Sequence, residues 1–177
     1  MKKNYSAFIA TSLDGFIAKS DGDISWLHRD YGKLDEGEDC GFSQFMSEQD
    51  FLLMGRKTYE QVCSFNEWPY NIPVGVLSSM PIKNVQYATA TFQTFKEVDK
   101  YIDKQSYGSI YIDGGVTISH LLELKMLNEI TITYIPILLG KGYRLFTNLQ
   151  SIDFATQLVQ SKTFPNGFVQ SHYKILY

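Results

Sequence analysis

The sequence has few of the residues from which disulfide frameworks and metal centres are built. It contains two cysteines, Cys40 and Cys63, and three histidines at distant positions. Two thiols are too few for a disulfide framework, and the separated histidines lack the spacing of metal ligands. We therefore expect a reduced, cytoplasmic protein that holds no metal ion.

Positive charge and long apolar runs are also scarce. Lysine and arginine number 16 against 19 aspartates and glutamates, which gives a formal net charge of -3. A nucleic-acid-binding surface normally needs an excess of basic residues, so the composition argues against a nucleic-acid partner. No apolar run is long enough to span a membrane, and the N-terminal apolar stretch is too short for a signal peptide. We expect no membrane partner.

What is present suits one globular domain. The 177 residues are 44% hydrophobic and 20% charged, which is sufficient to bury the core of an ordinary domain. The five prolines are spread from Pro69 to Pro165, and no repeat, low-complexity tract or linker interrupts the chain. We predict a single domain over residues 1–177.

Apolar segments with strand-like and helix-like patterns alternate along the chain. The predicted strands cover residues 5–11, 50–55, 74–79 and 109–115, and the predicted helices cover 39–48, 57–65 and 94–104, with one more after Gly115. Residues 12–38 read as a long loop. The final strands cover 129–140, 154–164 and 168–176, with a hairpin turn at Asn166-Gly167. This order predicts an α/β fold with a mixed, mostly parallel sheet, helices on both faces and antiparallel C-terminal strands.

The strand that ends at Gly55 is followed at once by Arg56, Lys57 and Thr58. A helix that starts here points free N–H groups and the positive end of its dipole outward, and the three side chains add two cations and a hydroxyl. This combination suits a phosphate. The alternative is a tight glycine turn with solvated cations. The residues alone support the two interpretations about equally.

Two other strand ends repeat the arrangement. Gly114 and Gly115 precede a helix, and Ser78 and Ser79 end the strand at 74–79. Each strand end is weak evidence for a ligand site by itself, because Gly-Gly more often marks a simple turn and serines commonly cap turns. In sheets of this kind ligands bind beyond the carboxyl ends of the strands. Three such ends together indicate a ligand with two separate anionic groups, such as a dinucleotide.

The loop after the first strand has a mixed character. Asp14-Gly15 and Asp21-Gly22 are turn pairs, and the apolar Phe16 and Ile17 lie between them. One interpretation is a surface hairpin whose apolar residues tuck underneath. The other is a mobile flap that covers a ligand and excludes water.

Five segments, in this order and spacing, resemble the dihydrofolate-reductase-like family, and most closely its branch with the reductase domain of bacterial riboflavin biosynthesis. The segments are SLDGFIA, DFLLMGRKTYE, VLSS, YIDGG and PILLGKGYRLF, and the resemblance runs from about residue 5 to the C-terminus. It implies a dihydrofolate-reductase-like fold, NADPH as hydride donor and, since the family often forms homodimers, a homodimer.

The resemblance also implies roles for particular residues. The 2'-phosphate side of NADPH would be held by Gly55, Arg56, Lys57 and Thr58, with help from Ser78 and Ser79. The pyrophosphate would be bound by Gly114, Gly115, Val116 and Thr117. The nicotinamide pocket would be lined by Ala10 and Ile17, with Asp14 holding the turn of the loop. A further matching element contains Leu139, Gly140, Gly142 and Phe146 and would close the cofactor site.

Two departures from the family patterns limit the range of substrates that the resemblance implies. Dihydrofolate reductases carry an arginine, 14 positions after the matched glycine, that grips the glutamate tail of folate, and Pro69 stands there in this chain. The riboflavin enzyme usually has an attached zinc deaminase with His-x-Glu and Cys-x-x-Cys signatures, and the chain has neither. The resemblance therefore extends at most to a reductase standing alone.

Asp39 is the candidate catalytic acid. Reduction of a C=N or C=O group benefits from a carboxylic acid in the pocket, and Asp39 lies 16 residues before Gly55, the separation of the substrate-binding acid in dihydrofolate reductases. A helix over 39–48 would place Asp39 with Phe42 and Met46 on the apolar face, where desolvation would raise its pKa. The alternative is that Asp39 only caps the helix.

The sequence thus predicts a cytoplasmic NADPH-dependent reductase that acts on a small heterocycle of pterin or aminopyrimidine type, similar to 5-amino-6-(5-phosphoribosylamino)uracil reductase or dihydrofolate reductase. The rival interpretation is a non-catalytic nucleotide-binding module, and it gains if Asp39 caps the helix and faces solvent. A third interpretation, a scaffold that binds a flavin or a drug, needs no preference for a 2'-phosphate.

Overall fold

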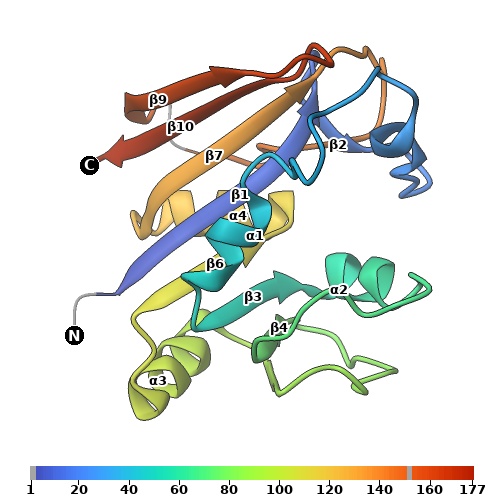
Figure 1. Cartoon of the computed structure of the whole chain (residues 1–177). Coiled ribbons are helices and arrows are strands. Elements are labelled where there is room, and N and C mark those ends of the chain that lie inside the picture. Colours follow the sequence, from blue (N-terminus) through green and yellow to red (C-terminus); the bar gives the residue numbers. More distant parts are fainter. Residues whose placement is uncertain (1–2, 151–152) are drawn as a thin grey trace.

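The computed structural model describes residues 3–150 and 153–177, and within them one large sheet organises the chain (Figure 1). Eight strands pair in the order β5-β4-β3-β6-β1-β7-β10-β9. Their bounds are β1 (Asn4–Ser12), β3 (Phe51–Gly55), β4 (Val74–Leu77), β5 (Ala90–Phe92), β6 (Ser109–Asp113), β7 (Leu127–Ile135), β9 (Ala155–Thr163) and β10 (Val169–Leu176). Neighbours from β5 to β7 are parallel, and β10 is antiparallel to both β7 and β9. The predicted mixed, mostly parallel sheet with antiparallel C-terminal strands is confirmed.

Helices cover both faces of this sheet, as predicted. The helices are α1 (Phe42–Ser47), α2 (Arg56–Val62), α3 (Phe95–Gln105) and α4 (Gly115–Glu123). Side chains of α1 and α2 pack with one buried cluster, and those of α3 and α4 pack with another on the opposite face. In Figure 1, α1 lies in front of the strands and α4 behind them. None of the described helices is long and apolar enough to cross a membrane.

Strand β3 shows why its sequence is a continuous apolar run. Phe51 and Leu53 pack into the α3/α4 cluster, whereas Leu52 and Met54 pack into the α1/α2 cluster, and all four are fully buried. Successive side chains of a strand point to opposite faces, so a strand covered on both faces needs apolar residues at every position. Full burial of each such side chain contributes about 1.5–3 kcal/mol.

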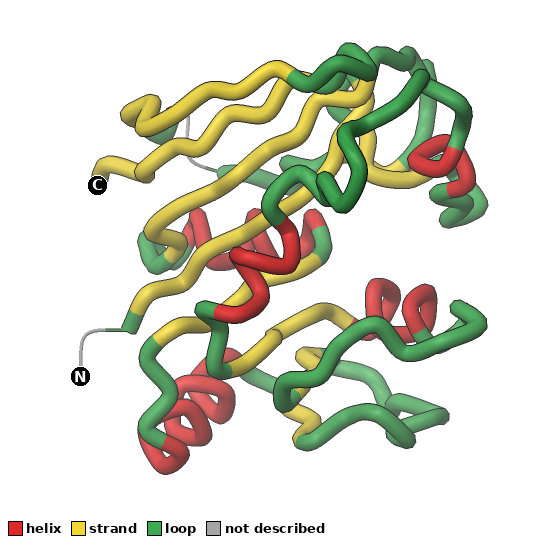
Figure 2. The backbone as a smooth tube through the Cα atoms, viewed as in Figure 1, coloured by secondary structure: helices red, strands yellow, loops and turns green. Residues whose placement is uncertain are grey.

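The region predicted as a long loop contains short elements of its own. Strand β2 (Phe16–Ala18) pairs with β8 (Tyr143–Arg144) in a separate two-stranded sheet, and the 3-10 helix η1 (Ser25–His28) follows. Figure 2 shows the remaining loop that leads from there to α1. We call residues 12–26 the flap.

Other boundaries differ from the prediction for local reasons. The helix expected over 39–48 begins only at Phe42, because Gly41 before it has a left-handed backbone with φ of 80°. Strand β7 ends at Ile135, since Pro136 has no N–H to donate to a neighbouring strand. The hairpin turn at Asn166-Gly167 is confirmed, with φ of 83° at Gly167.

Candidate functional site

The three predicted strand ends lie side by side at one edge of the sheet. Strand β3 pairs with β4 on one side, with Gly55 opposite Leu77, and with β6 on the other, with Met54 opposite Asp113. The helix after β3 packs on one face of the sheet, and the helix after β6 packs on the opposite face. This divergence is a topological switch point, the place where α/β sheets bind ligands. We use the name crevice for the region beyond the ends of β3, β4 and β6, at the starts of α2 and α4.

Two glycines and two threonines hold the starts of α2 and α4 together. A Cβ on Gly114 would lie 2.2 Å from Thr58 Oγ1, and a Cβ on Gly55 would lie 3.1 Å from Thr117 Oγ1. Gly114 also has φ of +89°, which a residue with a side chain rarely adopts. Each helix therefore places a threonine against the glycine of the other strand, and only glycine permits the approach at position 114.

The start of α4 offers free hydrogen-bond donors. Within the part of the chain that the structure describes, the backbone N–H groups of Gly115, Val116 and Thr117 have no acceptor. They lie at the positive end of the helix dipole, where an anion is stabilised. The predicted pyrophosphate residues thus form a set of donors suited to a phosphate.

The two cations of the α2 start point to protein partners. Arg56 Nη1 donates to both carboxylate oxygens of Glu60, at 2.8 and 2.9 Å. Lys57 Nζ lies 5.1 Å from the centre of the Tyr143 ring in β8. Both side chains are therefore in place at the crevice edge, although each has a competing contact.

The serines after β4 are less available than expected. The Ser78 hydroxyl donates to the Met80 carbonyl at 2.6 Å and accepts from the Met80 N–H at 3.1 Å, so it closes a local turn. Ser79 is exposed. The turn-capping alternative therefore describes Ser78.

Asp14 fastens the flap to the segment that follows β7. Its carboxylate accepts hydrogen bonds from the Leu139 N–H at 3.1 Å and the Gly140 N–H at 2.7 Å, and also from the Ser12 hydroxyl. The Ser12 hydroxyl and these N–H groups lower the pKa of Asp14 to about 2. The expected role of Asp14 in holding the turn is confirmed.

The flap rests against the start of α4. A Cβ on Gly115 would lie 2.6 Å from the Arg144 carbonyl oxygen and 3.1 Å from Ile17 Cδ1. A Cβ on Gly142 would lie 2.1 Å from the Ala18 carbonyl oxygen. Glycine at these positions lets β2 and β8 pack closely against the start of α4, with Ile17 beside Gly115.

Ala10 lies on the other side of β1, in a cluster around Trp26. Trp26 is fully buried, and its indole Nε1 is the one buried side-chain nitrogen or oxygen in the described ranges that lacks a hydrogen-bond partner. A buried N–H without an acceptor costs about 1–3 kcal/mol. The cluster around Ala10 therefore contains a donor that a water or ligand would satisfy.

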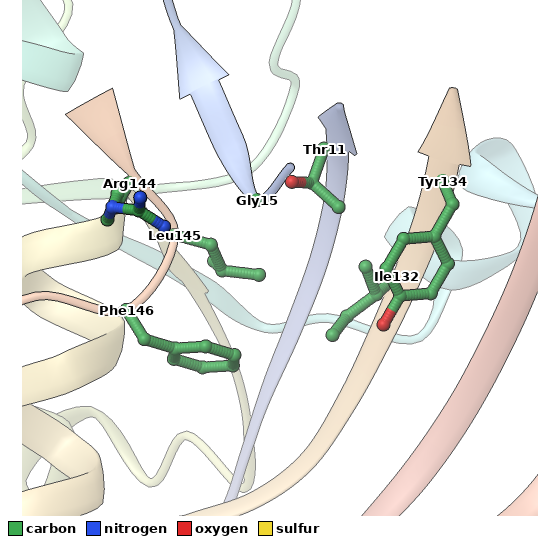
Figure 3. Close-up of a pocket in the computed structure, with 7 residues that line it drawn as sticks. All are labelled: Thr11, Gly15, Ile132, Tyr134, Arg144, Leu145 and Phe146. Atoms are coloured by element: carbon green, nitrogen blue, oxygen red, sulfur yellow. The ribbon is translucent and has the colours of Figure 1, made fainter. Parts of the chain in front are cut away.

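A small cavity of about 200 Å³ lies between the α3/α4 face of the sheet and the segment at the end of β8, with one flap residue, Gly15, at its border (Figure 3). Its lining consists of Thr11, Gly15, Ile132, Tyr134, Arg144, Leu145 and Phe146. Ile132 and Tyr134 belong to the core cluster of that face, whereas Ala10 packs on the opposite one. The cavity has room for a single ring, and it is separated by β1 from the side where an acid was expected.

The position of Asp39 contradicts the expectation for its pKa. Asp39 lies before α1, is exposed, and accepts hydrogen bonds from the Gly41 N–H at 2.9 Å and the Ser43 N–H at 2.7 Å. Hydrogen bonds from Ser43, and from the Gly41 N–H, lower the pKa of Asp39. The predicted raised pKa is wrong, because the backbone at Gly41 starts the helix too late to carry Asp39 on its apolar face.

Asp113 is an acid that the sequence reasoning missed. It ends β6, and its carboxylate accepts from the Gly114 N–H at 2.8 Å and from the Tyr70 hydroxyl at 3.3 Å. Burial raises the pKa of Asp113 to about 6, although both hydrogen bonds act in the opposite direction. An acid at the end of an apolar strand, directly before Gly-Gly, was the signal available in the sequence.

An aromatic group accompanies this acid. The Trp68 ring stacks on Tyr87 with centroids 4.5 Å apart, and it meets Tyr70 edge-on at 5.5 Å. The loop that carries Pro69, where folate reductases have an arginine, therefore brings aromatic rings and the Tyr70 hydroxyl toward Asp113. No group of three or more metal-ligating side chains occurs in residues 3–150 or 153–177.

The architecture is that of a dihydrofolate-reductase-like protein. Dihydrofolate reductase from Enterococcus faecalis, solved with NADP(H), superposes with a TM-score of 0.64 at 19% identity, over 98% of this chain and 97% of that one. The family model of the RibD C-terminal domain matches residues 81–170. The chain belongs to the RibD C-terminal domain family.

Two relatives match nearly the whole length. A putative riboflavin biosynthesis protein from Shewanella sp. PV-4 is 34% identical, with a TM-score of 0.87 over 98% of this chain and 99% of that one. The uncharacterized protein YwjB of Bacillus subtilis is 30% identical over 98% of both chains. The similarity to these two proteins therefore extends over nearly the whole chain, beyond the residues 81–170 that the family model matches.

We predict that Gly114→Ala destabilises the protein by roughly 2–4 kcal/mol, because the new Cβ must displace Thr58 and occupy a left-handed backbone. The matched control is Gly37→Ala, which has φ of +77° but no atom within 4 Å of the added Cβ. It should cost about 1 kcal/mol. Urea unfolding measures both free energies. Equal losses would show that the contact between Gly114 and Thr58 is unimportant.

Proposed function

We propose that this protein is an NADPH-dependent reductase that transfers a hydride to a small heterocyclic substrate of pterin or aminopyrimidine type. The observation that carries the proposal is the switch point, where two helix starts interlock through glycines and threonines beside a partly buried acid. Membership of the RibD C-terminal domain family supports the reductase class. We place the reaction in the cytoplasm.

The residues present fit the cofactor. Arg56, Lys57 and Thr58 would hold the 2'-phosphate, and the free N–H groups from Gly115 to Thr117 would hold the pyrophosphate. Ile17, seated against Gly115, and Ala10 would border the nicotinamide. When bound there, NADPH supplies the hydride. The likeness in fold to a dihydrofolate reductase solved with NADP(H) supports this assignment.

The substrate side favours an aminopyrimidine over folate. Pro69 has no charge with which to grip a glutamate tail, whereas the rings of Trp68 and Tyr70 suit a flat heterocycle. The relative from Shewanella is described as a putative riboflavin biosynthesis protein. We propose a substrate similar to 5-amino-6-(5-phosphoribosylamino)uracil. NADPH consumption with this compound and with dihydrofolate tests the choice, and faster turnover of dihydrofolate would contradict it.

Asp113 is better suited than Asp39 to supply the proton. An acid with a pKa near 6 is partly protonated at neutral pH, and the Tyr70 hydroxyl fixes the orientation of its carboxyl group. Asp39 is ionised and tied to the start of α1. We therefore assign the general acid to Asp113 and a capping role to Asp39.

One observation favours a second candidate function. Asp39 faces solvent and holds the start of α1, which is the arrangement expected of a non-catalytic nucleotide-binding module. Such a module would bind NADPH through the same crevice without turning over a substrate. Activity with any heterocycle excludes it.

The outer edge of the sheet supports a homodimer, which we also propose. All nine residues of β9 are exposed, among them Leu158 and Val159, and the strand has no acidic residue or proline, although its ladder with β10 contains a bulge at Val159. Two copies paired antiparallel near Val159 would place their two Lys162 side chains at opposite ends of the shared ladder, so no like charges meet. The strand is self-complementary, as an isologous interface requires.

Arg56→Ala should weaken NADPH binding by about one to two powers of ten and leave NADH almost unchanged. The reason is that a hydrogen bond to a charged group contributes roughly 1.5–3 kcal/mol, and only NADPH carries the 2'-phosphate. Titration calorimetry measures both affinities. Arg29→Ala, at an exposed arginine of the loop before α1, is the control. Equal losses of affinity for the two cofactors would show that Arg56 stabilises the fold and does not recognise the 2'-phosphate.

Asp113→Asn should lower turnover by about 10²-fold or more, since an amide cannot deliver the proton. In the unmodified enzyme the rate should fall as pH rises through about 6, because the protonated carboxyl group disappears. The variant should lose this pH dependence and keep its NADPH affinity. Asp39→Asn is the comparison. If Asp39→Asn loses most of its turnover while Asp113→Asn turns over normally, the general acid is Asp39 and the assignment to Asp113 is wrong.

Val159→Lys should convert the dimer to a monomer, because two lysines would face each other at the centre of the paired strands. Light scattering after gel filtration measures the mass. Thr91→Lys, in the opposite edge strand β5, should leave the dimer intact. A monomeric unmodified protein, or a dimer that survives Val159→Lys, would refute the β9 interface.

A further inference from the structure

Helix α2 carries a carboxylate beside the arginine that would bind the 2'-phosphate. Glu60 accepts two hydrogen bonds from Arg56 Nη1, and the side chains of Arg56 and Glu60 are 29% and 45% exposed. Lys57, the neighbouring cation, reaches Tyr143 instead. The charge that Glu60 offsets is therefore that of Arg56 alone.

The order of these two charges does not serve the helix. Arg56 is the first residue of α2, where the helix dipole disfavours a cation, and Glu60 lies toward the end that disfavours an anion. At a spacing of four residues, the opposite order, with the acid first, stabilises a helix better. This order of charges therefore stabilises the helix less than the opposite order would.

The contact does matter for an anion at Arg56. Both hydrogen bonds to Glu60 leave from one nitrogen, and a phosphate that approaches the guanidinium must share it with a carboxylate or displace that carboxylate. Two anions held on one guanidinium repel each other. A ligand with an uncharged 2'-hydroxyl meets no such repulsion.

We propose that Glu60 is a specificity-determining residue: it competes with the 2'-phosphate for Arg56 and holds the preference for NADPH over NADH below the value that Arg56 alone would give. This inference rests on the proposed function, since it takes the 2'-phosphate to lie at Arg56. It adds a residue that limits the selectivity that Arg56 confers.

The test compares the unmodified protein with Glu60→Gln by titration calorimetry. Glu60→Gln keeps the length of the side chain and removes its charge. We expect NADPH to bind about 3- to 10-fold more tightly and NADH to stay within about twofold, because one close charge repulsion is removed. The pair 2',5'-ADP and ADP should show the same difference, which separates the result from catalysis.

Two further variants isolate the cause. In an Arg56→Ala background, Glu60→Gln should change NADPH affinity by less than about twofold, since the competition acts through Arg56. Asp153→Asn removes an exposed acid that forms no ion pair with any described residue. It lies just before β9 at the far edge of the sheet, and its replacement should change the affinity for neither cofactor.

The outcomes separate this inference from the proposed function. If the unmodified protein binds NADPH but Glu60→Gln leaves the preference for NADPH over NADH unchanged, the pair of Arg56 and Glu60 is only a surface contact. The inference then fails while the proposed function stands. If Glu60→Gln weakens NADPH, Glu60 orients Arg56 instead, and the inference also fails. If neither NADPH nor 2',5'-ADP binds the unmodified protein, the proposed function fails with it.

Discussion

The close approach of Gly114 to Thr58 is the constraint on which the crevice depends. A side chain at position 114 would overlap the threonine hydroxyl, and the backbone there is left-handed. Because of this contact, the starts of α2 and α4 stay together although the two helices leave for opposite faces of the sheet. The free N–H groups of α4 and the cations of α2 then lie at one edge of the sheet, as the proposed binding of a molecule with two anionic groups requires.

Strand β6 connects this crevice to the proposed chemistry. Asp113 and Gly114 are consecutive, so one strand positions both the proposed acid and the start of the proposed phosphate-binding turn. Asp113 shares the face of Tyr111, which belongs to the α1/α2 cluster, whereas α4 leaves for the other face. A hydride donor held by α4 and a heterocycle packed near Trp68 and Tyr70 would therefore meet at the end of the same strand.

Much of this arrangement could be predicted from local sequence patterns. The three strand ends at Gly55, Ser79 and Gly114 were predictable, because apolar runs mark buried parallel strands and glycines mark the turns that follow them. The order β4-β3-β6 made them neighbours, as the dinucleotide interpretation required.

The acid was not predictable from the spacing. Asp39 matched a family position, but the backbone of Gly41 delays the start of α1 and leaves Asp39 in solvent. Asp113 acquires its raised pKa from burial, against the opposing effect of its hydrogen bond from Tyr70, which lies 43 positions away. Sequence periodicity carries no information about such an environment. The pairing of β2 with β8 was missed for the same reason, since it joins two short segments far apart in the chain.

Hydrogen–deuterium exchange with and without NADPH tests the central claim most directly, because it locates the bound cofactor without a substrate. The account predicts slower exchange at residues 55–58 and 114–117 and in the flap, residues 12–26, while the hairpin turn at 164–168 is unchanged. Protection confined to other parts of the chain, or no protection at saturating NADPH, would contradict the assignment of the crevice as the cofactor site.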